Sequence, residues 1–322
     1  KAFHVLGSLY LNGLGVEQDF LKAIELFHEF TIADKSILGD FNDYIEQTNI
    51  AAFLSSKISS DDYLCLGDRY MLGEGAEKNF SKALKYYEIS ANLNNPRATF
   101  NLGLIYFNGI NVKKDYIKAK HYFDLGANLG DSNSINYIGL FYLHGYSVKK
   151  DLNKAKEYFE ISCGLNNTYA FINLGNMYLF GNGVEQNFLK AKYFFEFAAK
   201  QKDPAALYNL GRLYINDDFK DHDYSIGLQY FIQSAKQGFS EAYTSLGVFY
   251  LEGKIVPSDY IKAIEYMELG AKQGNMDAIL NLGTLYISGF GVEQNYDEAM
   301  KYYKKSALLD NSDGFLKIGH FY

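Results

Sequence analysis

The stretch NLGNMYLFGNGVEQNFLKAKYFF, residues 173–195, carries the pattern on which the whole sequence is built. Gly175 stands inside an apolar helical pattern, Tyr178 follows three residues later, and Ala191 follows sixteen residues after the glycine. The same register recurs along the chain. Its central glycines are Gly7, Gly67, Gly103, Gly139, Gly175, Gly211, Gly247, Gly283 and Gly319, and from Gly67 onward each lies 36 residues after the last. A fixed period of this length indicates an array of repeats in which each unit packs on its neighbours.

Each unit predicts two helices, helix A around the central glycine and helix B after it. In the third unit, Asn95 is a suitable N-cap, Pro96 suits the first helical position, and Gly109 suits the end of helix A. Helix B is predicted to begin at Asp115 and to end at Gly130. The apolar positions of the two helices have helical spacing: Ala98, Leu102, Ile105 and Tyr106 in helix A, and Ala119, Tyr122, Phe123 and Ala127 in helix B. The sequence therefore predicts an all-α solenoid of 36-residue helix-turn-helix repeats.

Glycine in the middle of helix A makes helix formation less favourable by about 1 kcal/mol relative to alanine. Its recurrence indicates that a neighbouring helix approaches closely, and we expect the small residue of helix B, such as Ala119 in the third unit, to face it. The sixth unit departs from the pattern. Its turn is Asn216-Asp217-Asp218-Phe219 without glycine, and Gly227 replaces the alanine. We expect weaker packing there.

The predicted array spans residues 1–322, as about eight helix pairs and a truncated ninth. An insert at residues 34–59 lengthens the interval between the first two units. Asp40 could cap a short helix in it, or Leu38-Gly39 could be the relic of a decayed repeat.

The repeat pattern resembles the Sel-1-like repeat, a family of tetratricopeptide-like helical repeat proteins. In the fifth unit the residues that carry the resemblance are Leu174-Gly175, Tyr178, Gly181, Gly183-Val184, Lys190-Ala191 and Phe194-Phe195. Tetratricopeptide repeats share the helix pair but have a period of 34 residues. The resemblance implies an α/α superhelix whose A helices line a concave surface. It also implies a scaffold or adaptor that mediates protein-protein interactions.

The composition of the chain argues against several classes of function. The net charge is −7 with no dense basic run, which argues against binding of nucleic-acid phosphates. No apolar stretch is long enough to span a membrane. Cys65 and Cys163 lie at different positions of different units, which fits neither a disulfide framework nor a zinc site. Two free thiols favour a reducing compartment such as the cytoplasm, while the lumen of the endoplasmic reticulum stays open.

A binding site should use helix A positions that the core does not need. These are positions −2, +1 and +5 relative to the central glycine, which share one helix face. The predicted partner-binding groove consists of Asn101, Leu104, Tyr137, Leu140, His144, Asn173, Asn176, Phe180, Asn209 and Arg212, and the same stripe continues through Ser245, Val248 and Glu252. Carboxamides can donate to and accept from a peptide backbone, and aromatic residues are favoured anchors. Two structural readings stay open: the asparagines at −2 tie helix A to a neighbouring loop, and Tyr137, Leu140 and Phe180 are buried against the next repeat.

The sequence contains no catalytic, metal or cofactor motif that would make the chain an enzyme. The acidic turn at 217–223 lacks EF-hand spacing, and the glycine-rich turns lack the strand that precedes a phosphate loop. We therefore expect a non-catalytic adaptor that binds a protein or peptide in the groove of the A helices. The alternatives are a regulatory repeat region of a larger enzyme such as a protein kinase, since the chain starts and stops inside a repeat, or an adaptor subunit of an endoplasmic-reticulum-associated degradation ubiquitin ligase.

Overall fold

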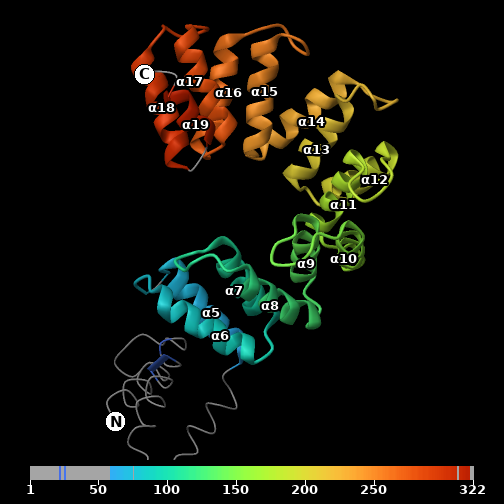
Figure 1. Cartoon of the computed structure of the whole chain (residues 1–322), viewed down its shortest axis with the longest axis vertical. Helices are drawn as coiled ribbons and strands as arrows, with labels where there is room; N and C mark the ends of the chain where they lie inside the picture. The colour runs from blue at the N-terminus through green and yellow to red at the C-terminus, as the bar shows by residue number, and fades with distance from the viewer. Residues whose placement is uncertain (1–21, 23–24, 27–58, 75, 310–311, 320–322) are drawn as a thin grey trace, which may run out of the picture. The chain divides into compact units, whose positions relative to one another are not determined.

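The structure, a computed structural model, describes residues 22, 25–26, 59–74, 76–309 and 312–319, and these residues form helices and short connections (Figure 1). The described A helices are α5 (Ser60–Leu72), α7 (Pro96–Asn108), α9 (Ser132–His144), α11 (Thr168–Phe180), α13 (Pro204–Tyr214), α15 (Ser240–Glu252), α17 (Met276–Ser288) and α19 (Ser312–Gly319). The B helices are α6 (Phe80–Asn92), α8 (Tyr116–Asn128), α10 (Leu152–Gly164), α12 (Phe188–Lys200), α14 (Tyr224–Lys236), α16 (Tyr260–Lys272) and α18 (Tyr296–Leu308). The predicted all-α repeat fold is confirmed. Of the predicted insert at 34–59, only Ser59, the N-cap of α5, lies within the described residues.

The ends of the helices follow the predicted signals. Asn95 accepts hydrogen bonds from the backbone of α7, Pro96 occupies its first turn, and Asp115 and Asp131 cap α8 and α9 in the same way. Gly109 ends α7 in the left-handed conformation at φ 72°, which a residue without a side chain adopts at little cost. These caps satisfy the free backbone groups at each end, so short helices of regular length can alternate with short turns.

Within each of the two compact units of the chain, helix A packs on helix B of its own repeat, and helix B packs on helix A of the next, as in the pairs α7–α8 and α8–α9. The chain divides into two compact units, residues 1–165 and 166–322. Neighbouring A helices also contact each other, in α7–α9 of the first unit and in α11–α13 and α15–α17 of the second. Among the described helices, no two B helices of adjacent repeats make contacts of that extent. Within each unit the A helices therefore lie on the inner side of the stack.

The central glycine of helix A makes room for a ring of helix B. A Cβ atom on Gly139 would lie 2.5 Å from Cε1 of Phe159, and Phe159 is fully buried. The same relation joins Gly67 to Tyr87, Gly103 to Phe123, Gly175 to Phe195, Gly211 to Phe231 and Gly283 to Tyr303, while Gly247 meets Met267. Close approach is thus confirmed. The alanine of helix B is buried too, but the atoms nearest the glycine belong mainly to the side chain four residues further along.

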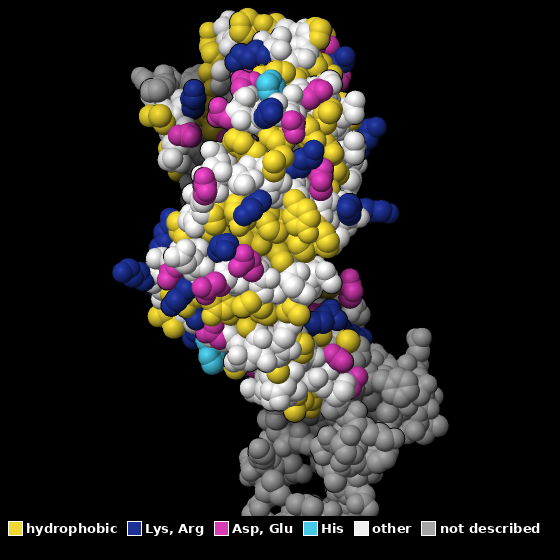
Figure 2. Space-filling model, turned by 90° about the vertical axis from the view of Figure 1, so that its right-hand side faces the viewer, with side chains coloured by type: hydrophobic (Ala, Val, Ile, Leu, Met, Phe, Trp, Pro, Cys, Tyr) yellow, Lys and Arg dark blue, Asp and Glu magenta, His cyan; other side chains and the backbone are white. Residues whose placement is uncertain are grey.

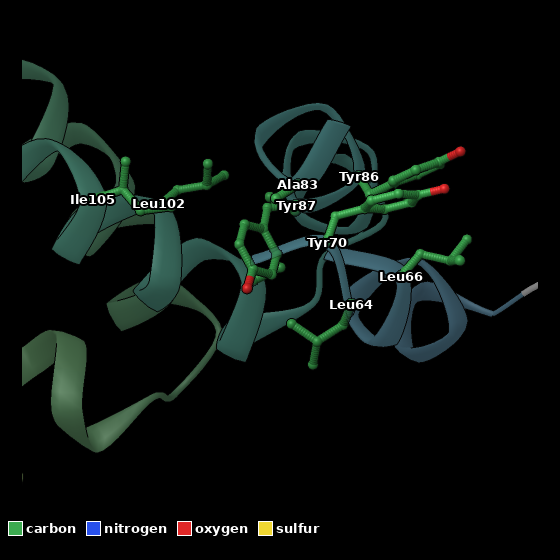
Figure 3. Packing of buried hydrophobic residues seen from close by; sticks show 10 residues of the cluster. Leu64, Leu66, Tyr70, Ala83, Tyr86, Tyr87, Leu102 and Ile105 are labelled. Carbon is green, nitrogen blue, oxygen red and sulfur yellow. The ribbon is translucent and has the colours of Figure 1, made fainter. Parts of the chain in front are cut away.

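The tyrosine three residues after each glycine stacks on an aromatic ring of helix B. The pairs are Tyr70–Tyr86, Tyr106–Tyr122, Tyr142–Tyr158, Tyr178–Phe194, Tyr214–Tyr230, Tyr250–Tyr266 and Tyr286–Tyr302, with ring centroids 5.6–5.9 Å apart. Figure 3 shows Tyr70 and Tyr86 lying over each other in the core of the second repeat. In five repeats, the ammonium group of a lysine from helix B lies over the ring of the tyrosine from helix A of the same repeat. These lysines are Lys82, Lys118, Lys154, Lys190 and Lys262, and their Nζ atoms lie 4.9–5.3 Å from the ring centroid. Each stacked pair contributes about 0.5–1.5 kcal/mol beyond its buried area.

The turn of the sixth repeat lacks glycine, and other side chains pack there. Phe219 in its glycine-free turn is 2% exposed, and its ring lies 5.7 Å from that of Tyr214. Helix α13 ends two residues early at Tyr214, which brings Ile215 against α14. A Cβ on Gly227 would lie 2.6 Å from Cγ2 of Ile215, so the isoleucine fills the space that an alanine methyl would take.

Candidate binding surface on the A helices

In the first unit, the predicted groove residues are partly used by the fold itself. Asn101 hydrogen-bonds Tyr87, whose hydroxyl also donates to Asp68 Oδ1 at 2.7 Å. Burial, and then Asp68, raise the pKa of Tyr87. Leu104 packs on the aromatic core of the third and fourth repeats, Leu140 is half-buried, and exposed His144 stacks on Tyr146 with centroids 5.2 Å apart. Asn101 therefore bonds to a side chain of the helix α6 and not to a neighbouring loop.

Tyr137 lies in a cluster of rings rather than free on the surface. Its centroid is 4.7 Å from that of Phe123, 5.5 Å from Phe107 and 5.6 Å from Phe100. These three rings belong to the preceding repeat, whereas the burial considered from the sequence was against the next one. Tyr137 is half-buried, and its ring joins two repeats of the first unit.

In the second unit, α11 and α13 bring several predicted residues together. Asn209 is 5% exposed, its Nδ2 donates to the Ala205 carbonyl at 2.9 Å, and its Oδ1 accepts from Arg212 Nη1 at 3.4 Å. The Arg212 guanidinium lies 5.2 Å from the centroid of Phe180, whose side chain is 50% exposed. Asn173 and Asn176 are half-buried on α11. Asn209 therefore has the local tie that the sequence left open, while Phe180 stays accessible.

A hollow of about 510 Å³ opens on the A helices α15, α17 and α19 of the second unit. Residues at positions −2 and +1 form part of its lining: Ser245 and Val248 from α15, Asn281 and Thr284 from α17, and Lys317 from α19. The remaining lining residues are Thr244, Phe249, Asp277, Leu280, Asp313 and Leu316. Three successive repeats thus present the same face to one hollow.

The sequence prediction missed the part of this lining that lies nearer the start of each helix. Asp277 and Asp313 occupy position −6, and Thr244, Leu280 and Leu316 occupy position −3. Extending the predicted stripe by one helical turn, with its i, i+3 and i+4 spacing, would have found them. A second hollow of about 510 Å³ lies where α12 meets α11, between Tyr178, Leu189, Lys190 and Tyr193.

The titratable groups with shifted pKa values have structural partners. Burial alone would raise the pKa of Glu25, but Lys82, Tyr70 and Lys22 hydrogen-bond its carboxylate and hold the pKa at about 2. Burial raises the pKa of the Cys163 thiol to about 12. Within the described part of the chain, no group of three or more His, Cys, Asp or Glu side chains is placed to hold a metal ion.

The charges on the face drawn in Figure 2 are mixed. Lysines and carboxylates lie interspersed with apolar and uncharged side chains, without a continuous basic band. Among the helices that the structure describes, none is both long and apolar enough to cross a bilayer.

A comparison with known protein families finds a match over most of the chain. The Sel1 repeat pattern matches residues 4–30, 64–95, 96–131, 132–167, 169–203, 204–239, 240–275 and 277–311. No curated protein matches the chain.

Solved structures show the same kind of fold. A protective antigen of uropathogenic Escherichia coli with an SLR fold is 28% identical with a TM-score of 0.56, and the match covers 100% of this chain but only 64% of the antigen. A Sel1 repeat protein from Oxalobacter formigenes is 27% identical with a TM-score of 0.62, covering 76% of this chain and 98% of its own. The immunity protein Pa5087 of Pseudomonas aeruginosa is 21% identical with a TM-score of 0.53, covering 67% of this chain and 82% of its own, and shares the fold. From its repeat matches and its helical hairpins, the chain belongs to the Sel1 repeat family, whose members typically serve as protein-protein interaction scaffolds.

Proposed function

We propose that this chain is a non-catalytic adaptor that holds an extended segment of a partner protein on the inner face of its A helices. One observation carries the proposal: position −2 of three successive A helices, together with position +1 of the first two, lines a single hollow. A surface that repeats with the helices suits a ligand that also repeats along its length, and a polypeptide backbone is such a ligand.

The chemistry of the hollow supports a peptide. Ser245, Asn281 and Thr284 offer hydroxyl and carboxamide groups that can donate to or accept from backbone amides. Leu280 and Leu316 offer apolar contact beside them, and Leu316 is 57% exposed. Exposed apolar side chains among polar groups are typical of a recognition surface.

The spacing of the repeats also suits an extended chain. Packed helices lie about 8–10 Å apart, and an extended strand advances about 3.3 Å per residue. A bound segment would therefore meet equivalent groove positions about every three residues. In the second unit, the proposal includes the predicted residues Asn173, Asn176, Phe180, Asn209 and Arg212. The first unit carries Asn101, Leu104, Leu140 and His144 on its own A helices, and Tyr137 is assigned mainly to packing.

The test is selection of binding peptides from a random library by the whole chain. A peptide of about 16 residues would cover about five repeats at three residues each. Enriched peptides are then measured by fluorescence anisotropy against the parent and against the double variant Ser245→Lys, Asn281→Lys. The matched control is Gln229→Lys, Gln233→Lys, which adds the same charge at exposed positions of α14.

The proposal expects the hollow variant to lose binding by tenfold or more and the control to keep it. Circular dichroism must show that both variants retain the helical content of the parent. Equal binding by all three proteins, or no enrichment by the parent, would contradict the proposal. The two narrower functions predicted from the sequence, a regulatory region of a kinase and a ubiquitin-ligase adaptor, stay predictions that the sequence of the full gene would decide.

A further inference from the structure

The A helices of the fifth and sixth repeats are almost free of charge. Helix α11 contains no Asp, Glu, Lys, Arg or His, and α13 contains a single charged residue, Arg212. Helix α9 likewise contains no Asp, Glu, Lys or Arg, and α7 contains only Arg97, although the chain as a whole carries 31 Lys and Arg residues and 38 Asp and Glu residues. Arg212 therefore sets the electrostatic character of this part of the A-helix face.

Arg212 is held in place by rings rather than by an acid. Its guanidinium lies 5.2 Å from the centroid of Phe180 and 5.8 Å from that of Tyr208. Tyr208 is itself fixed against Phe231 and Phe239, with centroids 5.4 and 5.3 Å away. Stacking covers the flat faces of a guanidinium and leaves the N–H groups at its edge.

Most of those N–H groups have no protein acceptor. A guanidinium has five N–H donors, and Arg212 makes one long hydrogen bond, from Nη1 to Asn209 Oδ1 at 3.4 Å. Among the described residues, no carboxylate lies within 4.0 Å of Arg212. The half-buried cation thus presents a rigid fork of donors without a counter-charge.

A second polar group on this surface also has unused capacity. Asn176 lies one helical turn before Phe180 on α11, and its Oδ1 is enclosed without a hydrogen-bond partner. Buried polar atoms nearly always have a partner. This oxygen is an acceptor, so a donor such as a backbone N–H of the bound segment could pair with it, whereas a carboxylate could not. The contact proposed for Arg212 therefore rests on the guanidinium itself.

We propose that Arg212 recognises the carboxylate of an aspartate or glutamate side chain within the partner segment. This inference rests on the proposed function and adds the chemistry of one contact. A carboxylate matches the guanidinium fork with two parallel hydrogen bonds. A side chain inside the segment is favoured over a terminal carboxylate because the A-helix face continues on both sides of Arg212, with Phe180 and Asn176 on α11 and with the hollow of α15, α17 and α19.

The test uses the peptides selected by the parent chain, with both termini capped. The proteins are the parent, Arg212→Gln, Arg212→Lys, and the control Lys85→Gln, which removes one charge from an exposed site on the B helix α6. Each is measured with the selected peptide and with the peptide in which Asp or Glu is replaced by its amide. Thermal unfolding confirms that each variant is folded.

The expected result is an acidic residue at one fixed position in the selected peptides. Arg212→Gln weakens binding about tenfold, the amide peptide weakens it equally, and the two changes together cost no more than either alone. Arg212→Lys keeps part of the affinity, and Lys85→Gln keeps all of it.

Three results would overturn the inference. One is binding that is sensitive to the hollow variant but not to Arg212→Gln, which leaves the proposed function standing. Another is binding that requires a free terminal carboxylate and ignores the acidic side chain. The third is a lack of any enriched peptide, which overturns the proposed function as well.

Discussion

Replacing the central glycine of helix A by alanine should destabilise the protein, although alanine is the better helix former. In Gly139→Ala the new methyl group would lie 2.5 Å from Cε1 and 2.7 Å from Cδ1 of Phe159. Carbon atoms pack best about 3.5–4.0 Å apart, so the ring or the helix must move by about 1 Å. Phe159 is fully buried and has no free space to enter.

The magnitude follows from two opposing terms. Overpacking of a close-packed core costs about 1–3 kcal/mol. The gain in helix propensity from glycine to alanine is about 1 kcal/mol. We therefore expect Gly139→Ala to lower the free energy of unfolding by up to about 2 kcal/mol.

The same repeat supplies the control. Gly164 is the last residue of α10, and a Cβ atom there would meet nothing within 4 Å. Gly164→Ala should be neutral or stabilising by up to about 1 kcal/mol. Gly211→Ala should fall between the two, because its Cβ would lie 3.0 Å from the Phe231 ring.

Urea denaturation followed by circular dichroism measures the differences. Repeat arrays can unfold in steps, so the midpoint of the transition that includes the fourth repeat is the quantity to compare. The reasoning would be refuted if Gly139→Ala were as stable as Gly164→Ala. The double variant Gly139→Ala, Phe159→Leu should recover part of the loss, which would locate the effect at the ring.

Three further predictions concern single side chains. Glu25→Gln should lower the free energy of unfolding by up to about 3 kcal/mol at pH 6, because the carboxylate has a pKa of about 2 in the folded protein. The difference between the parent and the variant should shrink as the pH falls from about 4.5 towards 2. Urea denaturation at each pH measures this difference. Cys163, with its pKa raised to about 12 by burial, should react with iodoacetamide at pH 8 at least about tenfold more slowly than exposed Cys65, measured by peptide mass spectrometry. Lys118→Ala should cost about 0.5–1 kcal/mol through its lost contact with the Tyr106 ring, measured as a shift in the urea midpoint.

Each of these has an opposing outcome. A stability difference between parent and Glu25→Gln that is the same at pH 3 and pH 6 would show that the carboxylate is not held ionised by its partners. Equal alkylation of both cysteines would contradict the burial of Cys163. An unchanged midpoint for Lys118→Ala would show that the lysine is only a solvated charge.

The repeat fold was predictable because it depends on spacing along the chain. The glycine period, the caps at Asn95 and Asp131 and the apolar face of α7 all follow from local preferences that a single sequence displays. The sixth repeat shows the limit of this approach. Its missing glycines predicted loose packing, but Phe219 enters the core and Ile215 occupies the space beside Gly227, which only the three-dimensional path of the turn reveals.

The candidate site was predictable as a face but not as a set of contacts. The stripe at −2 and +1 includes lining residues such as Ser245 and Asn281. Whether a given residue is accessible depends on the neighbouring repeat, and this is why Tyr137 is packed by three rings while Phe180 is half exposed. The contact between Arg212 and Phe180 joins residues 32 positions apart, in a direction that helical periodicity does not specify.

The pairing of each central glycine and each tyrosine with rings of the same repeat has a consequence for how such a chain can change in length. Removing residues 96–131 would delete Gly103 together with its partner ring Phe123, and Tyr106 together with the ring on which it stacks. It would also join Asn95, which is already a helix cap, to Ser132 in the place of Pro96. No ring would lose its partner within a repeat. The array can therefore gain or lose whole repeats by duplication or deletion of 36 codons. The length of the partner segment that it accommodates would then change in steps of about three residues.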